Sequence, residues 1–400
     1  FCTLMVLAYV AVVARADEPI AGRLLVPLVG DRVAATLVSI SDSGGILFHV
    51  DRNDRRLRPD EFVAWGSPAE PRTDRQLVLA DGGIIPVRLN PLPVIEQEQL
   101  IAVSDTFGEL KLPLKSLAGI ILHAPIDPQR RDELTARLRA AQGAAGSKSN
   151  NDRLLLENGD ELRGRIVALN ETAVDFEADL GALKVEIERV AALAFNPSLR
   201  AAPKTEGARL LVGFADGCIF AAESVRLNEG RSEIELVGGG STLSAGEEPI
   251  FLQPLGGAVK YLSDLPIASY RHLPYLDLPY EYRLDANVDG TRLRAAGNIY
   301  PKGVGMHSAA RLTWELKRTY RRFEAGLAID DQTGGRGSVV FRVFSGSREI
   351  YKSPIVRGGA RPLPVSVDIR DARQLSLVVD YADRADVLDH ADWLNARLVP

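Results

Sequence analysis

The sequence predicts an all-β protein in which several small β-barrel-like repeats and one short helix precede a jelly-roll-like β-sandwich. Short runs of alternating Leu, Val, Ile and Phe recur along the chain and are separated by Asn-Gly, Asp-Gly and Gly-Asp turn signals. Only residues 127–142 carry a helical period, with Leu134 and Leu138 at i and i+4. These two observations predict the all-β class, the small repeats and the single short helix.

Composition describes a globular protein with room for more than one domain. The 400 residues are 46% hydrophobic and 25% charged. The net charge is −5 and acids interrupt every Lys/Arg run, so we expect no nucleic-acid partner. Beyond the N-terminus, no run reaches the roughly 18–20 apolar residues of a membrane span. We therefore expect no membrane span.

The N-terminus has the features of a secretory signal peptide. An apolar run from Leu4 to Val13 precedes Ala14-Arg15-Ala16, a small-residue cleavage site. We expect residues 1–16 to be removed, which would place the protein outside the cell, in the periplasm or in the cell envelope. A buried strand is the alternative interpretation. Removal would leave Cys218 alone, so neither a disulfide framework nor a Cys/His zinc site is expected.

The repeat pattern is clearest at residues 153–195. Alternating Leu154 and Leu156, a strand over 162–169, Val174 with Phe176, alternation over 183–187 and a run over 191–195 predict five short strands. Related patterns occur at 22–65, 76–122 and 208–252, which indicates a repeat of about 45–55 residues. Each unit weakly resembles an SH3-like or Sm-like barrel. A pair of larger sandwiches is the alternative.

These patterns divide the chain into five parts. Residues 17–123 and 153–255 each hold two repeats, residues 124–152 hold the helix and a Gly/Ala/Ser-rich flexible linker, and residues 256–400 hold the sandwich, after the signal peptide at 1–16. The many charges of the helix are interpreted as a solvated face.

Several motifs in the last part carry a family resemblance. They are Val259–Leu265, Val288-Asp289-Gly290, Lys302–His307 (Lys-Gly-Val-Gly-Met-His), Gly337–Val343 and Asp389–Trp393 (Asp-His-Ala-Asp-Trp). Together they resemble the NPCBM family of carbohydrate-binding modules, often found beside glycoside hydrolases, over residues 256–400. Ser345-Gly346 departs from the Asp-Gly expected in one hairpin. The resemblance implies a β-sandwich that binds sugar and often carries structural calcium.

A Pro-interrupted aromatic segment, residues 270–282, supplies most candidate saccharide-binding residues. Aromatic faces suit the C–H side of a sugar, and phenol or imidazole groups hydrogen-bond its hydroxyls. The candidates are His272, Tyr275, Tyr280, Tyr282 and, at the end of the Gly303–Gly305 bend, His307. The alternative for each is structural packing. Trp314 and Trp393 lie in strand-like alternation and are assigned to the core.

Aspartates recur every three residues from Asp380 to Asp392. Carboxylates this dense repel one another unless they are solvated or bind a cation, and calcium prefers oxygen ligands. The predicted metal ligands are Asp386, Asp389, Asp392, Asp330 and Asp331. A solvated loop is the alternative.

Three functions fit the sequence. The first is a secreted, non-catalytic protein whose C-terminal module binds a glycan or polysaccharide. The second is an accessory or truncated glycoside hydrolase, although no Gly-x-Ser-x-Gly elbow or nucleotide-binding loop occurs. The third is a structural cell-envelope protein whose module binds another protein.

Overall fold

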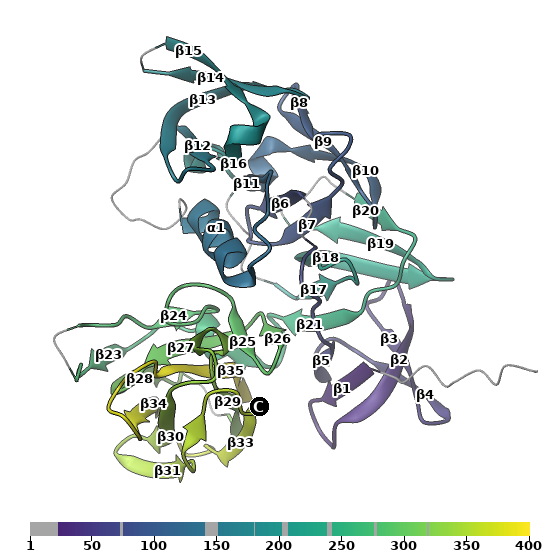
Figure 1. Cartoon of the computed structure of the whole chain (residues 1–400). Helices are drawn as coiled ribbons and strands as arrows, with labels where there is room; N and C mark the ends of the chain where they lie inside the picture. Colours follow the sequence, from purple (N-terminus) through teal and green to yellow (C-terminus); the bar gives the residue numbers. More distant parts are fainter. Residues whose placement is uncertain are drawn as a thin grey trace, which may run out of the picture.

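A computed structural model describes residues 23–72, 75–140, 151–179, 181–201, 207–237, 242–275, 278–317 and 320–400. The expected signal peptide and the predicted linker up to residue 150 lie outside these residues. Within them, strands dominate and α1 (Pro128–Ala140) is the single α-helix (Figure 1). No helix in this part of the chain is long and apolar enough to cross a membrane. The all-β prediction is confirmed.

The five strands predicted over residues 153–195 are present. Their bounds are β12 Asp152–Leu156, β13 Glu161–Leu169, β14 Ala173–Ala178, β15 Gly181–Glu186 and β16 Val190–Ala194. Neighbouring strands pair antiparallel from β12 to β15, and β12 also pairs with β16. Leu154, Val174 and Phe176 are fully buried because they alternate onto the inner face.

The other three units follow the same plan. The first holds β1 Arg23–Pro27, β2 Val33–Ile40, β3 Ile46–Val50, β4 Asn53–Leu57 and β5 Phe62–Gly66. The second holds β6 Arg75–Leu79, β7 Ile84–Val87, β8 Val94–Glu96, β9 Gln99–Ser104, β10 Gly108–Pro113 and β11 Leu117–Ile121. The fourth holds β17 Arg209–Gly213, β18 Ile219–Asn228, β19 Arg231–Leu236, β20 Thr242–Ala245 and β21 Phe251–Leu255.

The units join edge to edge. β11 of the second unit pairs with β16 of the third, and β5 of the first pairs with β21 of the fourth. Strands of all four units therefore belong to one 18-stranded hydrogen-bonded network, beside a three-stranded sheet of β8, β9 and β10. One continuous apolar core runs through them and includes Phe48, Phe176 and Phe220. Sharing edges leaves fewer strands with unpaired N–H and C=O groups.

Helix α1 lies between these units and the C-terminal sandwich (Figure 1). Leu134 and Leu138 are buried against the sheet, as predicted. The solvated-face interpretation is wrong for two charges, because Arg131 and Asp132 are only 3% and 2% exposed. Both lie at the junction, where other parts of the chain supply their partners.

The C-terminal sandwich consists of two six-stranded sheets and a small hairpin. One sheet has the order β24-β27-β35-β29-β33 with β22 on β35, and the other has the order β23-β28-β34-β30-β31 with β32 on β30. The bounds are β22 Lys260–Tyr261, β23 Ser269–His272, β24 Arg283–Leu284, β25 Leu293–Ala295, β26 Asn298–Tyr300, β27 Gly303–His307, β28 Ala310–Glu315, β29 Arg322–Ile329, β30 Ser338–Ser345, β31 Arg348–Lys352, β32 Val356–Arg357, β33 Leu363–Asp368, β34 Gln374–Tyr381 and β35 His390–Val399.

The sandwich core is aromatic at its centre. Trp314 and Trp393 are fully buried, as predicted, and Trp393 packs edge-on against Phe341 with ring centroids 4.9 Å apart. Short 3₁₀ turns complete the chain at Leu114–Ser116, Ile187–Arg189, Pro197–Leu199, Leu262–Asp264 and Asp331–Thr333.

The Gly/His segment is a central strand rather than the expected bend. β27 pairs with β24 on one side and β35 on the other. The requirement for small residues is nevertheless real, because a Cβ on Gly305 would lie 2.5 Å from the carbonyl oxygen of Ala286. The loop at Ala286 packs closely on Gly305, and His307 lies at the end of the same strand.

Candidate functional site

Aromatic and imidazole rings from three segments meet at one end of the sandwich. Pairing of β27 with β35 puts His307 directly opposite His390. The ring of Tyr280 stacks flat on His307, with centroids 3.9 Å apart and planes 3° apart. The rings of His272 and His390 lie 6.0 and 5.7 Å from that of His307. We call Tyr280, His272, His307 and His390 the rim cluster.

One carbonyl fixes the tautomers of two histidines. The oxygen of Ser308 lies 2.8 Å from Nδ1 of His307 and 2.9 Å from Nε2 of His272. Because a carbonyl can only accept, both nitrogens must donate. Burial lowers the pKa of His307, so the ring is neutral at pH 7 and its Nε2 is a hydrogen-bond acceptor. Nδ1 of His272 accepts from the backbone N–H of Tyr280, which holds that ring in place.

The third histidine is held by an acid. Nδ1 of His390 donates to Oδ2 of Asp289 at 3.2 Å, and the same carboxylate oxygen accepts from Nε2 of Gln332. The hydrogen bond with His390 lowers the pKa of Asp289, so this carboxylate is ionised at neutral pH. Asp289 is exposed, so a charged carboxylate beside the rim cluster faces solvent.

The predicted saccharide-binding residues divide into three groups. His272, Tyr280 and His307 lie together in the rim cluster. Tyr275 instead pairs with Tyr381, with ring centroids 6.0 Å apart, and both rings are about half exposed. Tyr282 packs against Tyr270 and the sandwich core, as the packing alternative predicted.

Sequence reasoning missed three members of the site, His390, Asp289 and Gln332. His390 and Asp289 both lie in motifs that carried the family resemblance, and this was the available signal. Their contact depends on the turn that holds residue 289, which lies between β24 and β25 and packs against β27.

The predicted metal ligands are not brought into one group. Asp389 accepts hydrogen bonds from Oγ of Ser308 and the N–H of Ser338. Asp392 lies three residues further along the chain, about 10 Å away at the strand rise, and neighbours Asp330. Asp331 accepts from the N–H groups of residues 296 and 297. Among the described residues, no group of three His, Cys, Asp or Glu could hold a metal ion.

Asp392 and Asp330 form a buried acid pair. Burial, followed by the charge of Asp330, raises the pKa of Asp392 well above its ordinary value. Burial also raises the pKa of Asp330, which accepts from the N–H groups of Arg294 and Gln332. Neither carboxylate oxygen of Asp392 has a hydrogen-bond partner within the described chain. Two adjacent carboxylates in this setting require a shared proton or a cation.

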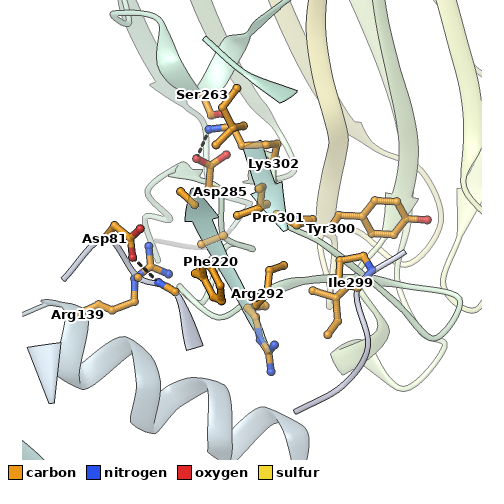
Figure 2. A pocket seen from close by; sticks show the side chains of 18 of the residues that line it. Asp81, Arg139, Phe220, Ser263, Asp285, Arg292, Ile299, Tyr300, Pro301 and Lys302 are labelled. Carbon is orange, nitrogen blue, oxygen red and sulfur yellow. Dashed lines mark hydrogen bonds and ion pairs between the residues drawn. The ribbon is translucent and has the colours of Figure 1, made fainter. Parts of the chain in front are cut away.

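A cavity of about 890 Å3 lies where α1 and the repeats meet the sandwich. Figure 2 shows Lys302 and Asp285 of the sandwich on one side and Asp81 and Arg139 on the other. Nζ of Lys302 lies 2.6 Å from both Asp264 and Asp285. Burial lowers the pKa of Lys302, but these two charges outweigh it and raise the pKa overall.

The same junction holds a buried ion cluster. Asp132 of α1 contacts Nε of Arg292 at 2.6 Å and Nε of Arg294 at 3.0 Å. Glu70 binds Arg131 at 3.2 Å and also contacts Arg294. The cavity walls are therefore lined by charges that largely compensate one another.

Comparison with known proteins finds one family match and several similar proteins. The NPCBM/NEW2 domain model matches residues 258–399. Alpha-1,3-galactosidase B of Akkermansia muciniphila is 34% identical over 119 residues, 29% of this chain and 15% of that protein. A Renibacterium salmoninarum protein named as an endo-alpha-N-acetylgalactosaminidase is 31% identical over 114 residues, 28% of this chain and 8% of that protein. The chain thus spans less than a sixth of either relative.

Two solved structures are similar to part of this chain. The CBM51 module of a Clostridium perfringens GH95 protein, solved with methyl-galactose, is 26% identical, covers 35% of this chain and 99% of that one, and has a TM-score of 0.32. CBM51-2 with INT domains from Clostridium perfringens ZmpB, solved with GlcNAc, is 23% identical, covers 44% and 39%, and has a TM-score of 0.33. From the matching family model and the motifs that form β27 and β35, residues 258–399 are an NPCBM domain.

Proposed function

We propose that this protein is a non-catalytic carbohydrate-binding protein whose NPCBM domain binds a saccharide at the rim cluster. The main support is the flat stack of the Tyr280 ring on the His307 ring, with centroids 3.9 Å apart and hydrogen-bonding groups around them. Stacked rings held by backbone contacts form a rigid platform, and rigid platforms lose little entropy when a sugar binds. The names of the curated relatives, both glycosidases of glycans that contain galactose-type sugars, agree with this class of ligand.

The rim cluster offers both acceptors and donors to a neutral sugar. The carboxylate of Asp289, which contacts His390, accepts, whereas the phenol of Tyr280 and the amide of Gln332 beside the cluster donate. A sugar hydroxyl both donates and accepts, so mixed partners of this kind match it. Burial raises the pKa of Tyr280, which keeps its phenol protonated at neutral pH.

A glycan array probed with the full chain tests the proposal. We expect binding to a subset of saccharides, and Tyr280→Ala should weaken it by about tenfold or more, since one aromatic contact contributes about 1–2 kcal/mol. His49→Ala, an exposed histidine of the first repeat unit, is the matched control and should leave binding unchanged. An array with no signal above background would contradict the proposal.

We also propose that the protein is exported with cleavage after Ala16, because the apolar run and the Ala-Arg-Ala site precede the repeats. Sequencing the N-terminus of the protein from a secreting host tests this. A mature chain that still begins before Asp17 would contradict it.

A second candidate is an accessory part of a glycoside hydrolase. Its support is that the relatives which share this domain are named as glycosidases. Incubation of the full chain with saccharides bound on the array, followed by product analysis, separates the two candidates. Released sugar would favour the hydrolase, and intact saccharide would favour binding alone.

Calcium remains a proposal, and the residues fit it only in part. The buried oxygens of Asp392 beside Asp330 would gain from a cation, but calcium prefers six to eight oxygen ligands. Saturating calcium should then raise the stability of the full chain by about 3 kcal/mol at a hundredfold excess over Kd. Asp392→Asn should remove that gain and Asp371→Asn, an exposed control, should not. If chelation leaves the melting temperature unchanged, Asp330 and Asp392 share a proton instead.

A further inference from the structure

A row of cations crosses the outer face of the sheet that contains β23. Arg271 of β23 pairs with Arg311 of β28, and Arg311 pairs with Val378 of β34. Val378 in turn pairs with Arg342 of β30, which pairs with Lys352 of β31. Directly paired residues project their side chains from the same face of a sheet. Four of the five positions in this row are therefore basic.

The two ends of the row differ in whether carboxylates neutralise the arginines. Arg342 contacts Asp380 at 2.9 Å and also contacts Glu349. Among the described residues, no carboxylate pairs with Arg271 or Arg311, which are both exposed. Like charges directly opposite each other destabilise a sheet. An anion bound between Arg271 and Arg311 would therefore reduce the repulsion between them.

The same face is hollowed into a groove of about 490 Å3, which Arg271, Leu273, Arg311, Phe344 and Asp380 help to line. The guanidinium carbon of Arg311 lies 4.6 Å from the centroid of the Phe344 ring, and that of Arg342 lies 4.9 Å from it. Stacking on one ring orders both guanidinium groups, so they lose less freedom when they bind an anion.

The groove and the rim cluster share the edge strand β23 but use its opposite faces. Arg271 lines the groove on the outer face and the next residue, His272, projects from the other face, while Ala309 of the groove follows Ser308. A saccharide that extends past the rim cluster over this edge would meet the two uncompensated guanidinium groups. Sulfate and carboxylate groups are the anions that a planar guanidinium binds through two hydrogen bonds.

We propose that this groove binds an anionic group, sulfate or carboxylate, on a glycan that extends from the rim cluster. This inference rests on the proposed saccharide site and specifies its ligand as an acidic glycan. The row is short and the chain carries a net charge of −5, which disfavours the extended basic surface that a nucleic acid needs.

The test uses the full chain with dextran sulfate, polygalacturonate and uncharged dextran, measured by calorimetry at low and moderate salt. We expect tighter binding of at least one acidic polymer than of dextran, with affinity that falls as salt rises. The double variant Arg271→Glu/Arg311→Glu should weaken acidic-polymer binding by at least tenfold. Arg55→Glu/Arg56→Glu, at two exposed arginines of β4, makes the same change in net charge and should have little effect. Comparison of the two acidic polymers separates sulfate from carboxylate.

Failure of the groove and failure of the saccharide site give different results. If Tyr280→Ala abolishes array binding but the double variant binds every polymer as the natural protein does, the groove inference is wrong and the proposed function stands. If the array is silent and the double variant still loses acidic polymers, the proposed function is wrong and the groove is only a polyanion site. A single-stranded oligonucleotide that binds as tightly as dextran sulfate and is lost in the double variant would overturn the assignment to glycans.

Discussion

The junction cavity and the rim cluster differ in how their polar groups are satisfied. The cavity is large, about 890 Å3, but Lys302 and Asp132 each already contact two opposite charges. The rim cluster is small, yet the half-buried Tyr280 ring and the exposed carboxylate of Asp289 beside it can still be reached by a ligand. Volume alone would select the cavity. The cavity also has buried polar atoms without a hydrogen-bond partner, at Ser263 and Arg292, so the rim cluster is favoured by its stacked rings and its exposed carboxylate. The ion pairs of the cavity walls hold two parts of the chain together.

The largest effect is expected from breaking the junction. Asp132→Ala would leave Arg292 and Arg294 at a buried interface with Glu70 as the remaining acid, and loss of one partner from a buried ion pair costs about 3–5 kcal/mol. Denaturant unfolding measures this. Asp127→Ala, which removes the side chain that accepts from Gln129 and Arg130 at the start of α1, should cost only about 1 kcal/mol. Equal losses would show that the ion cluster does not bind the two parts together.

The next largest effect is a pH dependence of the free energy of unfolding, which we expect from Asp389. Burial raises the pKa of Asp389, which holds Ser308 below the rim cluster, from 3.8 to about 6. A folded-state pKa above the unfolded value means that protonated Asp389 favours folding, fully below about pH 4, and that this contribution is lost as pH rises through 6. The loss is about 3 kcal/mol.

The check is a comparison of unfolding free energies between pH 4 and pH 8. Asp389→Asn, which cannot ionise, should lose less stability than the natural chain over this range. Parallel pH profiles for the two proteins would contradict the assignment of this titration to Asp389.

A smaller effect is expected at the edge of the rim. Tyr275 stands 58% exposed against Tyr381, so Tyr275→Ala should change the melting temperature very little. If the saccharide extends beyond the rim cluster, the variant should weaken binding by several-fold, about 1 kcal/mol for an exposed aromatic contact. Calorimetry with the best array ligand, with Tyr280→Ala for comparison, decides how far the site reaches.

The smallest effect is expected where charge is solvated. Arg357 and Asp383 pair on the surface with both side chains about half exposed. Arg357→Gln should therefore cost less than about 1 kcal/mol, in contrast with Asp132→Ala. A loss as large as that at the junction would mean that exposure does not explain the difference between the two ion pairs.

Local patterns in the sequence were enough to predict most strands. Leu154, Val174 and Phe176 alternate with polar residues, so each strand and its buried face could be read from period alone. The edge pairing of the units could not be predicted, because an exposed edge offers the same N–H and C=O groups to any strand.

The structure brings three of the five predicted saccharide-binding residues together, and sequence reasoning did not identify the residues that contact them. The aromatic segment and His307 were found because few residues suit a sugar platform. The row from Arg271 to Lys352 depends on register between distant strands, and the contact of His390 with Asp289 depends on where a turn packs. Composition reveals neither. The prediction that the helix charges are solvated was wrong at Asp132 for the same reason, because its partner Arg292 lies 160 residues away in the sequence.

The pairing of β5 with β21 delays the completion of the first unit during synthesis. Trp65 pairs with Leu252, so one edge of β5 has no partner until almost the whole repeat region has left the ribosome. At about 5–20 residues per second, that wait is on the order of 10–40 s. During this time the nascent chain presents an open strand edge that other chains could pair with. The first unit should therefore depend on chaperones or on rapid translation more than the third unit, whose β12 and β16 pair within about 40 residues.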